Sequence, residues 1–222
     1  RKGRGFDLKT LLENLQFIDV KNYKLYGRYP KISLPIETRI LDKLLSIKTK
    51  IKDLIRKNGK PIYYRFAGGR YFKVITPYET GSSAEKIIYL DKYIANNVGA
   101  ILSSNLFFWY YQIFSDNLNL KSYEIESFPI PINELSEERI KVLETLYDDY
   151  LKDIEKNAKI RTTEKYANID TFKEYKIGKS KKYIDAIDDF IGSLYGLNEE
   201  EIKFIKNYEI EFRLTENEEN EN

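Results

Sequence analysis

Apolar residues recur at alternating spacings of three and four positions in two long stretches of the chain. This heptad pattern predicts two long helices, Glu37–Lys57 and Ser136–Ala158. The apolar positions are Ile40, Leu44, Ile47, Ile51 and Leu54 in the first helix, and Ile140, Leu143, Tyr147, Tyr150 and Ile154 in the second. Two such helices either pair as an antiparallel stalk or pack on a common core, and the second arrangement is the more frequent one.

An aromatic helix is expected between these two, beginning at Asn105 and ending at the polar break 115–117. A short segment then leads to Phe128-Pro129-Ile130-Pro131, where the two prolines exclude a central helix or strand. Aromatic side chains bury large areas. The stretch 102–131 is therefore predicted to form the centre of the core.

The strongest strand signal lies at Pro61–Thr76. Two aromatic and β-branched runs flank Gly68-Gly69 there, and this pattern predicts a hairpin with the glycine pair as its tight turn. Glu85–Leu90 is predicted to be a further strand, with Asp91 capping a helix over Lys92–Ser103.

The C-terminal stretch is expected to hold two more helices. Ser180 is the expected N-cap of the first, Gly196 ends it, and Asn198 with Glu201 forms a capping box for the second. The first has Ile184, Ile187, Ile191 and Leu194 inside and Asp185, Asp188 and Asp189 outside. Weaker patterns predict a helix over Asp7–Leu15, an edge strand over Lys31–Leu34 and a short strand over Phe172–Ile177. Together the elements predict an α+β fold: a mixed α/β core with a small sheet, long helices and a helical C-terminal segment.

Composition narrows the class of protein. The chain has 222 residues, 42% hydrophobic and 14% aromatic, which suffices for a packed core. It has no Cys and no His, which excludes disulfides, thiol nucleophiles, histidine bases and ordinary zinc sites. No apolar run approaches the roughly 20 residues of a membrane span. The chain begins with Arg1 and shows no signal peptide, so we expect a piece of a longer cytoplasmic protein without a membrane partner.

The net charge of +2 hides an asymmetry along the chain. Residues 1–76 carry 19 Lys/Arg against 6 Asp/Glu, and residues 131–222 carry 15 against 23. Such an asymmetry favours a polyanion-binding face backed by a face that avoids polyanions. The alternative is that surface lysines only keep the protein in solution.

The hairpin supplies the first candidate binding residues. Arg65 and Arg70 would share one face beside Tyr63, and like charges repel unless a polyanion lies across them. Arginine binds guanine edges and phosphates in a bidentate manner. Pairing of these arginines with distant carboxylates is an equally good interpretation. Further candidates are Lys73 in the hairpin, Thr80 and Ser82 in the loop 77–83, and Asn117, Asn119 and Lys121 in the loop 115–122. Asparagine residues in loops more often serve to stabilise a turn than to bind a ligand.

The segment KSKKYIDAIDDFIGSLYGLNEEEIKFIKNYEIEFR, residues 179–213, resembles the closing segment of type II and IIG restriction–modification enzymes, which are adenine-specific DNA methyltransferases with their own specificity domain. Upstream, Gly69-Arg70-Tyr71-Phe72 and SNLFFWYYQIFSDNLNL with the following FPIP are similar to the TaqI-like C-terminal specificity domain, the target-recognition domain of these enzymes. The resemblance covers residues 60–214.

The resemblance implies a division of labour with a catalytic domain that precedes this piece. The family uses S-adenosylmethionine, held by a glycine-rich loop, and an Asn-Pro-Pro-Tyr type motif for the flipped adenine. Neither motif is present here, because no two prolines are adjacent and none follows Asn or Asp. S-adenosylmethionine, with magnesium as a further candidate, is thus expected only in the full-length enzyme. Whether an endonuclease accompanies the methyltransferase stays open. Asp170, Glu174 and Lys176 mimic a nuclease metal site, but their spacing is too short, and we reject that interpretation.

The expected function is therefore sequence-specific binding of double-stranded DNA, with no catalytic residue in this piece. Residues 1–131 form the expected target-recognition region, 132–214 a helical spacer that docks on the chain's own methyltransferase domain, and 215–222 a disordered acidic tail. Arg1, Lys2 and Arg4 would hold phosphates, while the hairpin and the two loops read bases. The alternative is a helical protein-interaction module whose heptad seams bind a partner.

Overall fold

The computed structural model describes residues 17–67, 73–165, 168–210 and 213. The predicted α+β class is confirmed: helices predominate, with a three-stranded antiparallel sheet of order β2-β1-β3 and a separate hairpin β4-β5. The strands are β1 Ile55–Arg65, β2 Ile75–Thr76, β3 Glu85–Leu90, β4 Lys159–Lys165 and β5 Asn168–Glu174. The helices are α2 Pro35–Ser46, α3 Ala95–Leu102, α4 Asn105–Phe114, α5 Ser122–Glu126, α6 Glu137–Lys156, α7 Lys181–Leu194 and α8 Glu199–Asn207. Short 3-10 turns lie at Lys21–Tyr23, Ile51–Leu54, Ile132–Glu134 and Ile177–Ser180.

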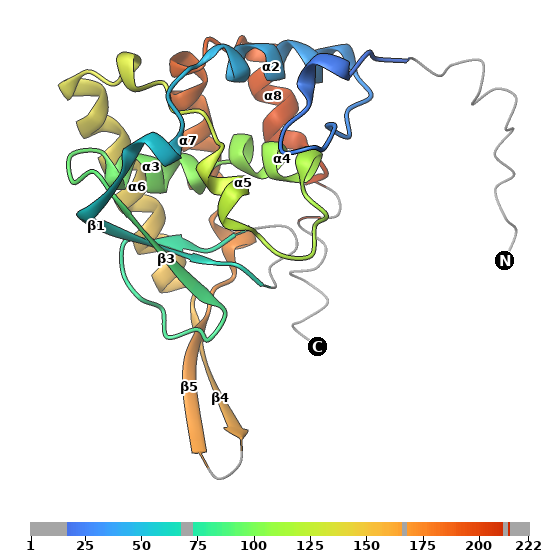
Figure 1. Cartoon of the computed structure of the whole chain (residues 1–222). Helices are drawn as coiled ribbons and strands as arrows, with labels where there is room; N and C mark the ends of the chain where they lie inside the picture. Colours follow the sequence, from blue (N-terminus) through green and yellow to red (C-terminus); the bar gives the residue numbers. More distant parts are fainter. Residues whose placement is uncertain (1–16, 68–72, 166–167, 211–212, 214–222) are drawn as a thin grey trace, which may run out of the picture.

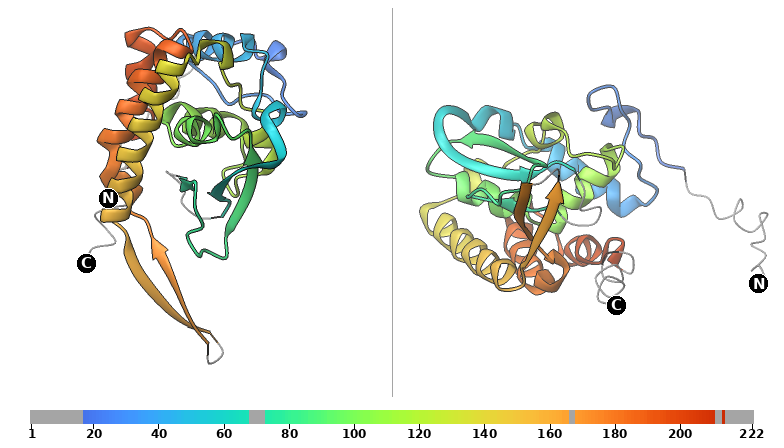
Figure 2. Two further views of the ribbon diagram at one scale, coloured as in Figure 1. Left: turned by 90° about the vertical axis from the view of Figure 1, so that its left-hand side faces the viewer. Right: turned by 90° about the horizontal axis from the view of Figure 1, so that it is seen from below.

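The elements stack in layers around two central helices. Helices α6 and α7 run side by side as one wall, α3 and α4 lie in the middle, and the three-stranded sheet covers the opposite side (Figures 1 and 2). All ten residues of α4 are buried. A helix that is apolar on every side is stable only when other elements surround it, which explains its central position.

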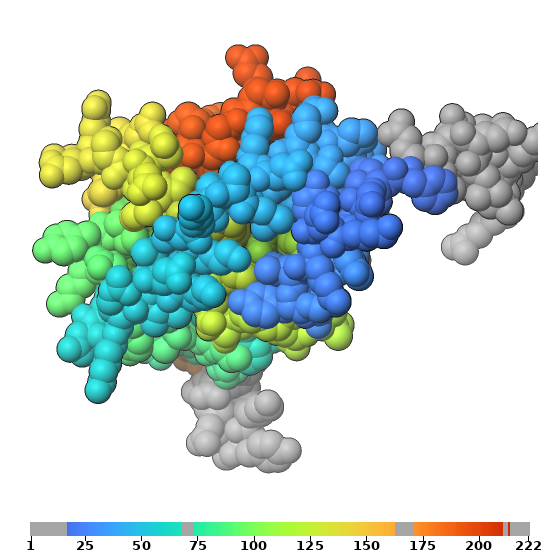
Figure 3. Space-filling model, turned by 45° about the horizontal axis from the view of Figure 1, so that its top comes forward, coloured from blue at the N-terminus to red at the C-terminus, as the bar shows by residue number. Residues whose placement is uncertain are grey.

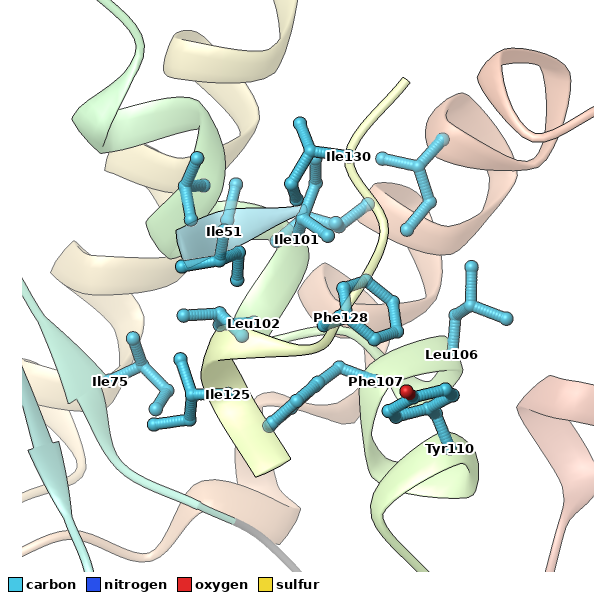
Figure 4. Close-up of a cluster of buried hydrophobic side chains, with 14 of the residues drawn as sticks. Ile51, Ile75, Ile101, Leu102, Leu106, Phe107, Tyr110, Ile125, Phe128 and Ile130 are labelled. Carbon is cyan, nitrogen blue, oxygen red and sulfur yellow. The ribbon is translucent and has the colours of Figure 1, made fainter. Parts of the chain in front are cut away.

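Phe128 lies at the centre of the aromatic cluster (Figure 4). Its ring packs edge-on against Phe107 at 5.2 Å and against Tyr110 at 5.0 Å between centroids. The backbone beside it is also bound, because the amide of Ile51 donates to the carbonyl of Phe128 at 3.0 Å. The prediction that 102–131 forms the core centre is confirmed, and one buried cluster includes residues from both expected domain ranges.

A buried carboxylate satisfies the first turn of α4. Asp188 of α7 accepts the backbone N–H groups of Asn105 and Leu106 at 3.0 and 3.1 Å, and the Asn105 side-chain amide at 2.6 Å. Arg213 donates to the side-chain oxygen of Asn105 at 2.7 Å. Burial raises the pKa of Asp188 to about 7, and the hydrogen bonds oppose that rise. The expectation that the Asp188 side chain faces solvent is wrong. It points into the core because the first N–H groups of α4 need acceptors there.

The predicted long helix Glu37–Lys57 is wrong beyond Ser46. Residues 49–51 pair instead with the proline-containing segment: Ile130 donates to the carbonyl of Thr49 at 2.9 Å, and Lys50 bridges to Pro129. Ile51 remains buried, so the apolar spacing marked core positions but not helix length. Tertiary pairing overrode the local periodicity.

The hairpin register also differs from its prediction. A two-residue turn at Gly68-Gly69 would place Tyr64 opposite Lys73, whereas the structure places it opposite Ile75, two residues further along. The turn itself lies outside the described residues. The strand Glu85–Leu90 and the helix capped by Ser136 are confirmed as β3 and α6.

Three smaller predictions are corrected. Lys31–Leu34 is not a strand, although the Lys31 amide donates to the carbonyl of Ile113 at 2.8 Å. The helix expected from Lys92 begins only at Ala95. The Ser180 hydroxyl donates to Asp153 at 2.7 Å instead of capping α7.

Both the Asn198–Glu201 capping box and the left-handed Gly196 (φ 64°) are confirmed. Asp7–Leu15 and 215–222 lie outside the described residues, and a strand predicted at 172–177 occurs as β5, ending at Glu174.

Phe128→Ala should lower the free energy of unfolding by about 3–5 kcal/mol, since it removes a fully buried ring and leaves a cavity. Denaturant unfolding measures the change. Tyr93→Ala is the matched control because that aromatic side chain is 85% exposed, and its effect should stay within about 0.5 kcal/mol. Equal effects of the two substitutions would contradict the central placement of Phe128.

Asp188 should make stability fall as pH rises from about 4 to about 7. The folded pKa lies above the ordinary value of 3.8, so the folded state holds the proton more tightly than the unfolded chain does. Relative to Asp188→Asn, the wild-type free energy of unfolding should drop by on the order of a few kcal/mol across that window. With no His in the chain, few other groups titrate near neutrality. Parallel pH curves for the two proteins would contradict the assignment.

Candidate nucleic-acid interface

A basic strip, residues 48–60, leads into the sheet. It contains six cations and one acid, Asp53. The Asp53 carboxylate already accepts the backbone amide of Lys50 at 2.8 Å. In the described structure Arg56 approaches Asp91 at 3.8 Å, and the side chains of Lys48, Lys52 and Lys57 are exposed. Figure 3 shows this part of the chain, in light blue and cyan, along one face of the molecule.

Strand β1 carries the strip to a junction at Phe66, where two loops meet. The Phe66 amide donates to the carbonyl of Ala84 at 2.9 Å, and its own carbonyl accepts the amide of Leu120 at 2.8 Å. Ala67 forms a bridge with Asn119. The loops 77–84 and 115–121 are thus fixed to the same end of β1. We call this region the Phe66 junction.

The hairpin residues predicted to bind lie at or near the junction. Arg65 stands opposite Glu85 across the strands, and its Nε donates to the carbonyl of Ala67 at 2.9 Å. Tyr63 is half-buried, opposite Ile87. Arg70 lies outside the described residues, as do Arg1, Lys2 and Arg4.

Lys73 is not a surface cation. Its side chain is 7% exposed, with the amine 4.8 Å from the centre of the Tyr111 ring. Burial lowers the pKa of Lys73 to about 8, an effect that nearby Glu124 opposes and Arg65 reinforces. The packing against Tyr111 leaves little of Lys73 for a contact with DNA.

Glu85 holds the loop that carries Thr80 and Ser82. Its carboxylate accepts the Thr80 amide at 3.1 Å and the Thr80 hydroxyl at 2.7 Å. Ser82 accepts the amide of Ala84 at 3.3 Å through its hydroxyl, beside the left-handed Gly81 (φ 80°). Both hydroxyls therefore have structural partners within the loop.

The 115–121 loop owes its shape to turn chemistry. Asn117 has a left-handed φ of 61°, and its amide donates to the Ser115 hydroxyl at 3.1 Å. Lys121 forms an ion pair with Asp116, which holds the pKa of that carboxyl below its usual range. Asn119 is exposed next to the bridge with Ala67. The turn interpretation holds for Asn117, while Asn119 has the surface position that a contact requires.

Sequence reasoning missed Phe66 and Lys86 as parts of the site. The Lys86 amine lies 4.8 Å from the centre of the Phe66 ring and adds a cation to the junction. The signal was available in the strand predictions, since Phe66 directly follows β1 and Lys86 is the second residue of β3.

The exposed face of α6 carries charges of both signs. It exposes Glu137, Glu138, Asp148 and Asp149 together with Lys141, Lys152 and Lys156. Helix α6 lies in the wall on the side away from the sheet (Figure 2). In the described ranges no group of acidic side chains is arranged to hold a metal ion. Glu174, one residue of the rejected nuclease metal site, is paired with Arg161 at 2.5 Å and with Lys176 at 3.2 Å.

Of the helices that are described, none is long and apolar enough to cross a membrane.

Comparison with known proteins gave no match to a family model, a curated protein or a solved structure.

Glu85→Ala should free the 77–84 loop from the sheet. Loss of both Thr80 hydrogen bonds should speed exchange of the Thr80 amide by about ten- to a hundredfold, as expected for 1–3 kcal/mol. Hydrogen exchange followed by NMR measures this rate. Glu79→Ala, a change at the exposed neighbouring carboxylate, should leave it unaltered. Equal rates in the two variants would show that Glu85 does not hold the loop.

Proposed function

We propose that this chain is the DNA target-recognition region of an adenine-specific restriction–modification methyltransferase. It binds double-stranded DNA and positions a catalytic domain that lies elsewhere in the enzyme. S-adenosylmethionine belongs to that domain, because this sequence has neither the glycine-rich loop nor the Asn-Pro-Pro-Tyr type motif.

The observation that carries the proposal is the basic strip joined to the Phe66 junction by β1. Exposed lysines neutralise phosphates, while short loops held at one end of a strand can present side chains to base edges. The six residues Lys60–Arg65, which pair in regular register with β3, span about 20 Å between the basic strip and the junction. Phosphate contacts and base contacts thus lie within one site.

The charge distribution is compatible with the same orientation. The exposed face of α6, which carries four exposed carboxylates and three exposed lysines, lies on the far side of α3 from β1 (Figure 2). A duplex approaching the basic strip would leave these carboxylates facing solvent or the catalytic domain.

The alternative of a helical interaction module loses its main support. Leu143, Tyr147, Tyr150 and Ile154 of the second seam are all buried in the chain's own core. The first seam is divided between α2 and the turn at 51–54, with Ile40, Leu44 and Ile51 fully buried. A partner helix would therefore find neither seam free.

A triple substitution tests the proposal: Lys48→Gln, Lys52→Gln and Lys57→Gln. Each phosphate contact contributes about 0.9 to the slope of log affinity against log salt, so the slope should fall by up to about 2.7. Affinity for mixed-sequence duplex DNA at low salt should fall with it. Fluorescence anisotropy over a salt series measures both quantities.

The matched control removes the same charge from the wall away from the sheet: Lys141→Gln, Lys152→Gln and Lys156→Gln on α6. These lysines are exposed, and their loss should leave affinity and salt slope close to wild type. Equal loss in both triple variants would mean that only net charge matters, and the basic strip would not be the binding face.

A further inference from the structure

The β4–β5 arm, formed by residues 159–165 and 168–174, extends away from the body of the molecule (Figures 1 and 2). Within the described residues, its two strands pair only with each other, in register from Lys159 opposite Glu174 to Lys165 opposite Asn168. Seven residues per strand give a length of about 23 Å. Ile160 is 74% exposed, and Thr162 and Thr171 are exposed as well. A two-stranded ribbon whose described side chains are mostly exposed has little stability of its own in water, as expected of an element that a partner covers.

The base of the arm is anchored to α6. Glu155 accepts the Tyr175 hydroxyl at 2.5 Å and the Lys173 amine at 2.6 Å. Arg161 pairs with Glu174 across the two strands. The direction of the arm is therefore set by a helix in the wall of the core.

The arm emerges beside the Phe66 junction. The carbonyl oxygen of Thr171 lies 4.0 Å from the position that a Cβ on Gly81 would occupy. Gly81 sits between Thr80 and Ser82, in the loop that Ala84 fixes to Phe66. Arm and loop are thus neighbours at one end of the molecule.

We propose that the β4–β5 arm is a DNA-binding ribbon that enters the major groove next to the 77–84 loop. This inference rests on the proposed function and adds a binding element from the region 132–214, which had been expected only to dock or space the catalytic domain. The major groove is about 12 Å wide and about 8.5 Å deep and admits a two-stranded ribbon. At about 23 Å the arm is long enough to reach its floor.

The half of the arm whose side chains are described suits a groove better than a protein interface. Eight arm residues have described side chains, 159–162 and 171–174, and two of them, Ile160 and Phe172, are apolar. Stable protein interfaces have an apolar centre. Thr162 and Thr171 stand opposite each other and offer hydroxyls that bond to base edges or phosphates.

The absence of Cys allows a direct test by site-specific cross-linking. Thr162→Cys places one thiol on the arm, and Thr145→Cys places one at an exposed position on α6, in the wall away from the sheet, as the matched control. Each full chain is mixed with duplex DNA of mixed sequence whose thymines carry a C5 tether activated as a mixed disulfide. The C5 position lies in the major groove, so disulfide exchange reports the arm's presence there.

Thr162→Cys should cross-link at least about tenfold more than Thr145→Cys, since only the arm enters the groove that displays C5. Salt-dependent DNA binding by the unsubstituted chain is measured in parallel. If that binding persists while the two yields are equal, the arm lies outside the major groove and this inference fails alone. If the unsubstituted chain does not bind DNA at low salt, the proposed function fails and the arm's role fails with it.

Discussion

The fold depends on the burial of helix α4 on every side. Its aromatic residues bring a large apolar area into the core, and its backbone has to be satisfied without water. Asp188 of α7 does this at the first turn by accepting two backbone N–H groups, and the Ser104 hydroxyl accepts the amide of Phe107. The surrounding layers are arranged around that helix.

The position of the candidate interface follows from this burial. Helix α4 runs directly into the 115–121 loop, whose Leu120 is buried and whose amide binds the carbonyl of Phe66. On the other side α3 packs beneath the sheet, and Tyr147 of α6 donates to the carbonyl of Ile75 in β2 at 3.1 Å. The loops at the end of β1 are thus held by rigid elements, as a specific binding surface requires.

Much of the fold could be predicted from the sequence where local signals agreed with tertiary packing. The aromatic run at 105–114, the Ser136 cap and the Asn198–Glu201 box each specify an element through short-range chemistry. Prediction failed where distant contacts decide the outcome. Residues 49–51 leave the helical pattern because they pair with Phe128–Ile130. The Asp188 side chain points into the core because the first N–H groups of α4 have no acceptor within that helix.

The site was predictable as a set of loops and a strand, but not in its arrangement. Thr80, Ser82 and Asn119 converge because Phe66 binds both Ala84 and Leu120, partners 18 and 54 residues away that no local pattern reveals. Lys73 was expected on the surface because lysine is rarely buried, yet Tyr111 provides an aromatic face for its amine. The basic strip was visible as composition, although its predicted helical setting was wrong.

We propose that this chain binds duplex DNA and selects a sequence. Selection from a pool of randomised duplex DNA by the purified chain at two salt concentrations, followed by sequencing, tests both parts of this proposal. We expect binding that weakens steeply with salt and enrichment of one short sequence. Absence of binding at the lower salt concentration would contradict it.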